Sequence, residues 1–109
     1  MDIKNINSQL INWDKIAGTE TKGEKGINIS KVFALNNIRI RLSEYSVDYV
    51  TAEWCSKGHI IHCIEGELNI LLKSGNNIML TEGKSVILRD GDQHKGTTGN
   101  KPAKIFVVD

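Results

Sequence analysis

The sequence has little of several features that mark particular protein classes. Its 14 Lys and Arg residues against 13 Asp and Glu leave a formal charge of only +1, so it lacks the excess of basic residues that nucleic-acid or anionic-membrane surfaces need. No apolar run approaches the ~18–20 residues that span a bilayer. The N-terminus lacks the basic stretch and apolar block of a signal peptide. We therefore expect a soluble, cytoplasmic protein that binds neither nucleic acid nor membrane.

The sequence also has few cysteines, and 109 residues leave little room for more than one core. We expect a single domain over 1–109, with 1–26 as an N-terminal segment and loop and 27–109 as the barrel. Within the first part, residues 18–26 read as a polar loop, and Asn12–Ala17 is a short helical candidate. The two cysteines, Cys55 and Cys63, are expected to be reduced thiols, because no secretion signal accompanies them.

Glycine is plentiful, and its placement predicts the fold class. Most of the ten glycines fall from Gly58 onward, at intervals of roughly eight residues, which is typical of an all-β sandwich or barrel. Apolar and polar residues alternate between them, as in Ile38–Leu42 and Leu68–Leu72, and a period of two favours strands. The stretches 74–77 and 90–92 read as hairpin turns, because Gly and Asn accept positive φ.

Residues with metal-ligating side chains gather in one stretch. Glu53 and Cys55 are two residues apart, so on a strand they share a face. Ser56-Lys57-Gly58 fits a hairpin connection, which would pair Cys55 with His59 across the turn. These three side chains would then form a triangle on one sheet face. In the same register Cys63 lies roughly 13 Å from Cys55, too far for a disulfide, and is expected in the core.

Two histidines and two arginines are the other polar candidates for the site. His94 follows a glycine-containing turn and is the candidate fourth ligand, whereas His62 has the opposite strand parity to His59 and is expected outside the site. Arg39 and Arg41 alternate with apolar residues. They either lie on a solvated face or bring one guanidinium into the barrel mouth to bind a substrate carboxylate.

The order of these residues resembles the cupin superfamily. With Gly66 as the closing glycine of the family's first motif, His59 stands at the glutamate position, and Cys55 and Glu53 stand at the two histidine positions. Gly83, Gly91 and His94 fit the second motif. The sequence departs from the family with Val47 for the opening glycine, Arg89 for proline and Thr98 for asparagine. The resemblance implies a cupin double-stranded β-helix, a jelly-roll barrel.

A closer resemblance is to small cupin-fold proteins named for an Asp-His-Cys-Trp (DHCW) motif, in which Asp-His precedes Trp-Cys-Ser-Lys-Gly-His. Residues 54–59 match that motif, and further similarity runs from Asn37–Arg41 to the terminal Phe106–Asp109. Ala52 replaces the Asp and Glu53 replaces the His. Glutamate also ligates metals, so the resemblance implies a metal site of altered composition, and it carries no particular reaction.

The expected ligands of one divalent metal are thus Glu53, Cys55, His59 and His94. Thiolate and imidazole ligands favour Zn, with Fe or Ni as alternatives. We expect either a metal-dependent enzyme acting on a small polar molecule or a non-catalytic module that senses or binds a small ligand or metal. A barrel with a decayed site is a third reading. Cupin habit and exposed sheet edges also imply a homodimer.

Overall fold

The computed structural model describes residues 3–109, and almost all regular structure in it is β-strand. A single 3-10 turn, η1 (Trp13–Lys15), lies within the short helical candidate. Among the described residues, no helix has the length and hydrophobicity to cross a membrane. The eight strands are, in chain order, β1 (Thr19–Lys22), β2 (Ile27–Leu35), β3 (Ile38–Tyr45), β4 (His59–Leu72), β5 (Asn77–Thr81), β6 (Ser85–Leu88), β7 (His94–Thr97) and β8 (Ala103–Val108).

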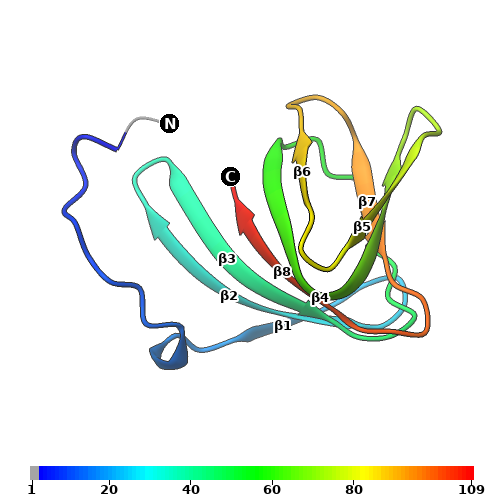
Figure 1. Cartoon of the computed structure of the whole chain (residues 1–109), viewed down its shortest axis with the longest axis horizontal. Helices are drawn as coiled ribbons and strands as arrows, with labels where there is room; N and C mark the ends of the chain where they lie inside the picture. The colour runs from blue at the N-terminus through cyan, green and yellow to red at the C-terminus, as the bar shows by residue number, and fades with distance from the viewer. Residues whose placement is uncertain (1–2) are drawn as a thin grey trace.

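The strands form two antiparallel layers that share β4 (Figure 1). The first half of β4 pairs with β8 and β6, and β8 continues through β3 and β2 to β1. The second half of β4 pairs with β5 on one side and β7 on the other. The chain therefore folds as an all-β jelly-roll barrel, which confirms the predicted fold class.

Gly66 marks the place where β4 passes from one layer to the other. A register shift interrupts the β4–β8 pairing between Cys63 and Glu65, and such bulges bend a strand. Gly66 follows with φ +77°, and a Cβ there would collide with the carbonyl oxygen of Pro102. Glycine is needed here both for its backbone conformation and for this close approach.

The core lies between the layers. Inward-facing residues of β4, β5, β6 and β8 form one buried cluster, made of Ile61, Cys63, Leu68, Ile70, Leu80, Leu88, Ala103, Ile105 and Val107. These positions alternate along their strands as the sequence predicts. Cys63 is fully buried and both cysteines are free thiols, as expected.

Two local predictions were wrong. Part of the predicted polar loop at 18–26 is strand β1. All four residues of β1 are exposed, so the sequence shows no apolar alternation there that would predict a strand. Residues 90–92 do form a turn with Gly91 at φ +91°, but β6 and β7 are not a hairpin, because each pairs with a different half of β4. The turn at 74–77 does join a hairpin, β4–β5.

Candidate metal centre

Cys55 is positioned by the start of β7. Its amide donates to the carbonyl oxygen of His94, and the His94 amide donates to the carbonyl oxygen of Cys55, both at 2.9 Å. This isolated bridge fixes Cys55 beside His94, although the chain between Thr51 and Gly58 forms no regular strand. The predicted pairing of Cys55 with His59 in a hairpin was therefore wrong.

The connection Ser56–Gly58 packs against the turn between β6 and β7 instead of reversing the chain. The Gly58 amide donates to Oδ1 of Asp90 at 2.7 Å, and the Gly91 amide donates to the carbonyl oxygen of Ser56 at 2.9 Å. A Cβ on Gly58 would lie 2.7 Å from the same Asp90 oxygen. As a result His59 begins β4 and pairs with Leu88 of β6.

Three of the four predicted ligands nevertheless meet. Sγ of Cys55 lies 3.4 Å from Nε2 of His59, and the rings of His59 and His94 stand edge to face with centroids 5.1 Å apart. One ligand atom from each of the three residues lies within 4.8 Å of the other two. Both histidines are buried, and Cys55 is half-buried.

The far nitrogen of each histidine is held by another group. Nδ1 of His94 lies 2.9 Å from the carbonyl oxygen of Asp92. A carbonyl can only accept, so Nδ1 carries the proton and Nε2 keeps its lone pair. Nδ1 of His59 lies 2.9 Å from Oδ2 of Asp109, whose side chain is fully buried. Neither atom makes a hydrogen bond within the described residues, so their contact is electrostatic.

The surroundings keep His59 neutral. Burial is the largest cause that lowers its pKa, from 6.5 to about 4, and the positive charge of Arg41 lowers it further, while Asp109 opposes both. A metal ligand must offer a lone pair, so a neutral imidazole at physiological pH suits this role.

The donor set fits a zinc-like ion. Zn–S bonds of about 2.3 Å and Zn–N bonds of about 2.0–2.1 Å place tetrahedral ligand atoms roughly 3.3–3.6 Å apart. The 3.4 Å separation of the Cys55 and His59 ligand atoms falls in this range. One thiolate and two imidazoles leave a tetrahedral position for a further ligand, the arrangement typical of catalytic rather than structural sites.

The other predicted site residues do not all lie near the cluster. Glu53 is exposed and does not belong to the cluster of ligand atoms. Arg41 enters the interior and lines a cavity of about 170 Å³ together with the cluster, whereas Arg39 is not among the lining residues. His62 lies on the opposite face of β4, within 2.8 Å of the Ser85 hydroxyl oxygen, so its parity predicted its place.

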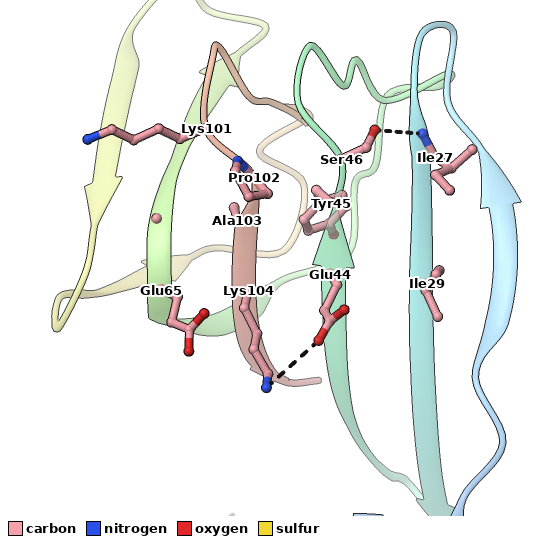
Figure 2. A pocket seen from close by; sticks show the side chains of 11 residues that line it. Ile27, Ile29, Glu44, Tyr45, Ser46, Glu65, Lys101, Pro102, Ala103 and Lys104 are labelled. Atoms are coloured by element: carbon pink, nitrogen blue, oxygen red, sulfur yellow. Dashed lines mark hydrogen bonds and ion pairs between the residues drawn. The ribbon is translucent and has the colours of Figure 1, made fainter.

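A larger hollow of about 530 Å³ lies elsewhere, on the outer face of β3 and β8 (Figure 2). Glu44 and Lys104 form an ion pair of 3.8 Å at its rim, and Ile29 contributes apolar surface. None of the residues that line it is a histidine or a cysteine. The chemistry is therefore concentrated in the smaller interior cavity.

Comparison with known proteins shows which solved structures have a similar fold. No family model and no curated protein matches the sequence. Among solved structures, the chain is similar to a predicted oxalate decarboxylase from Thermotoga maritima (13% identity, 92% of this chain and 96% of that chain, TM-score 0.77). It is also similar to a cupin-2 domain containing protein from Shewanella frigidimarina (21% identity, 73% and 78%, TM-score 0.60). The chain has the cupin fold.

The cupin neighbours include enzymes. One is ectoine synthase from P. lautus, with 17% identity, a TM-score of 0.75 and coverage of 93% of this chain and 76% of that chain. At these identities the likeness shows the fold and not the reaction. In this chain, Cys55, His59 and His94 line the same interior cavity as Arg41.

Sequence reasoning missed three residues around the centre. Asp109 belongs to no motif, and nothing in the sequence links it to His59. Tyr45 and Tyr49 also line the cavity, with ring centroids 4.7 Å apart. Tyr45 could have been found, because it has the same strand parity as Arg41. Burial raises its pKa, so its phenol stays protonated and can donate a hydrogen bond.

Proposed function

We propose that this protein is a small metal-dependent cupin enzyme that acts on a small polar molecule inside the barrel. The observation that carries the proposal is the meeting of Cys55, His59 and His94 beside a lined cavity. A catalytic centre needs an open coordination position next to room for a substrate. The finer resemblance to the DHCW group supports a metal at this site, since Cys55 and His59 belong to that motif, but it carries no particular reaction.

The metal, zinc by the donor chemistry, would be held by the Cys55 thiolate and the two Nε2 atoms. When bound, it supplies Lewis acidity and lowers the pKa of a bound water to about 7. The chain's own residues supply the rest. Asp92 and Asp109 hold the histidine rings, Tyr45 offers a hydroxyl donor, and Arg41 brings a positive charge.

A non-catalytic sensing or binding module is the second candidate. The cysteine ligand favours it, because thiolate coordination responds to oxidants and to competing metals. The two candidates share the metal centre and differ in whether a bound ligand is converted. Turnover of a ligand that enters the cavity supports the enzyme, whereas ligand-dependent change without turnover supports the module.

Metal analysis of protein purified without an affinity tag tests the centre. We expect about one equivalent of metal in the natural protein and in two controls, His62→Gln and Glu53→Gln. We expect Cys55→Ala and His94→Gln to lose it, because each removes a ligand. Circular dichroism checks that the variants fold. Equal substoichiometric metal in all five proteins would overturn the proposal.

We also propose that the protein is a cytoplasmic homodimer. Two free cysteines are consistent with a reducing compartment. Dimerisation is supported by β6, an edge strand that pairs with β4 alone among the described strands. Ile87 on β6 is 79% exposed, and its cross-strand neighbour Ile60 is 48% exposed. Exposed apolar edges of this kind favour pairing between subunits.

A further inference from the structure

The residues that line the interior cavity favour some classes of ligand over others. It measures about 170 Å³ and is bounded by β2, β3, β4, β7 and β8 and by the segment that carries Cys55. Two cationic side chains line it, Arg41 and Lys95, but no Asp or Glu side chain does so among the described residues. The amine of Lys95 lies 5.0 Å from the centroid of the Trp54 ring, in a cation–π contact. Arg41 makes no such cation–π contact with any residue in the described part of the chain.

Arg41 is held with one donor unsatisfied. Its Nε is buried and has no hydrogen-bond partner among residues 3–109. A buried donor without an acceptor costs roughly 1–3 kcal/mol, and a functional role or a bound group is among the physical reasons that such donors persist in native proteins. Arg41 lies on β3 between Val32 of β2 and Val107 of β8, so its backbone is fixed by pairing on both sides.

A bound metal would increase the excess of positive charge in the cavity. A divalent ion with one thiolate ligand leaves a net positive centre, and Arg41 adds a further positive charge in the same small space. The histidines contribute no negative charge, and Asp109 lies on the far nitrogen of His59 rather than in the cavity lining. Like charges that share a low-dielectric cavity are unfavourable, so an anionic ligand would stabilise the loaded centre.

The rest of the lining combines polar residues (Asn28, Thr51 and the two tyrosines) with an aliphatic part, and this aliphatic part narrows the class of anion. Ile61, Leu68, Ile70 and Ile105 contribute hydrocarbon surface to the cavity. A volume of 170 Å³ corresponds to about six water molecules at ~30 Å³ each. An acid of a few heavy atoms would fill this space, with its charged end at Arg41 and its hydrocarbon end against the four aliphatic side chains.

We propose that the cavity binds a short aliphatic carboxylic acid and that Arg41 is the residue that recognises its carboxylate. The planar guanidinium matches a carboxylate with two parallel hydrogen bonds. This inference rests on the proposed function, since it names the substrate class of the same centre. Inorganic phosphate shares the charge, but it has no hydrocarbon part for the apolar walls to contact.

The test uses propionate as probe, with propionamide and inorganic phosphate beside it, on cobalt-loaded and on metal-free protein. Visible absorption of cobalt and thermal unfolding are the two readouts. We expect propionate to change the cobalt spectrum and to raise the melting temperature, while propionamide and phosphate do so far more weakly. Arg41→Gln should weaken propionate binding at least tenfold and still bind one equivalent of cobalt. Arg39→Gln, on the same strand but outside the cavity lining, is the matched control.

The outcomes separate this inference from the proposed function. If cobalt fails to bind, the metal centre is wrong, and the thermal shift of the metal-free protein still measures recognition of the carboxylate. The inference is overturned if Arg41→Gln binds propionate as the natural protein does. It is also overturned if propionamide or phosphate equals propionate on the natural protein, a comparison that does not depend on any variant folding.

Discussion

At the scale of single residues, groups outside the cluster orient the two histidines for metal binding. The Asp92 carbonyl oxygen fixes the tautomer of His94, and Asp109 faces the far nitrogen of His59. The Asp109 backbone exchanges two hydrogen bonds of 2.9 Å with Arg39, which holds its buried side chain in place. Both imidazoles thus keep Nε2 available on the cavity side, which a metal centre requires.

The Asp109–His59 contact predicts a measurable effect on metal affinity. Asp109→Asn removes the charge that orients and polarises the ring, so we expect metal binding to weaken by about 10–100-fold. Competition with a chromophoric chelator measures the affinity. Asp14→Asn, which changes an exposed carboxylate in η1, serves as control. An affinity of Asp109→Asn within twofold of the control would show that Asp109 does not support the centre.

The low pKa of His59 predicts how stability depends on pH in the metal-free protein. The folded ring has a pKa of about 4, against an ordinary value of 6.5. Between these values the unfolded state binds more protons, so the free energy of unfolding falls as the pH is lowered from 6.5 toward 4, by about 3 kcal/mol in total. Above pH 6.5 this contribution is constant.

Urea unfolding across this pH range, with chelator present, tests the linkage. His59→Gln cannot titrate, so its stability should decline less steeply, and the difference between the two curves isolates His59 from the carboxylates that titrate nearby in pH. Parallel curves for the two proteins would contradict the assignment of the low pKa to His59.

The sequence allows part of the centre to be predicted at this scale. Strand parity separates His59 from His62, and the spacing of His94 from Gly83 and Gly91 singles it out. Parity could not decide between Arg39 and Arg41, because both share a face and only their distance along the barrel differs. Glu53 does not join the cluster, because the expected strand around Cys55 is an irregular segment.

At the scale of elements, β4 organises the molecule because it belongs to both layers. Its first half carries His59 and its second half pairs with β7, at whose start His94 lies. The bend at Gly66 therefore helps set where the two histidines meet. The alternation of apolar residues predicts a strand at Leu68–Leu72, with Gly66 at a turn before it, whereas β4 runs through Gly66 as one strand. Local pattern does not reveal this continuity or the change of partners, since the partners come from distant segments of the chain.

Gly66→Ala tests the bend. A side chain at φ +77° is strained, and its Cβ would meet the Pro102 carbonyl oxygen, so we expect a loss of about 1–3 kcal/mol in unfolding free energy. Gly99→Ala is the control, because a Cβ there has no neighbour within 4 Å. Chemical denaturation measures both. Equal stability of the two variants would mean that β4 tolerates the bend without glycine.

At the scale of the whole molecule, the glycine spacing and the strand periodicity suffice to predict an all-β sandwich or barrel, and the resemblance to the cupin motifs implies the jelly roll. The crossing of the β6–β7 connection between layers is not predictable locally, because its turn residues are those of an ordinary hairpin. Neither is β1, whose residues are all exposed. The features that escape prediction are those in which tertiary partners, and not local pattern, decide the pairing.

The proposed dimer also belongs to this scale. We expect light scattering to give the mass of two chains for the natural protein and of one chain for Ile87→Asp, because a charge on the exposed edge of β6 opposes pairing. Met79→Asp places the same charge at a residue that is 54% exposed on β5, and it should remain dimeric. A monomeric natural protein would refute the proposal, and a dimeric Ile87→Asp would show that β6 is not the contact.

The proposed function depends above all on Cys55, His59 and His94 holding one metal ion with a coordination position left open. A crystal structure of the metal-loaded protein, with an anomalous difference map at the metal's absorption edge, decides whether they do. We predict a single peak bonded to Sγ of Cys55 and to Nε2 of His59 and His94, with solvent or a small ligand in the fourth position. A peak elsewhere, or the Glu53 carboxylate in the fourth position, would contradict the proposed centre.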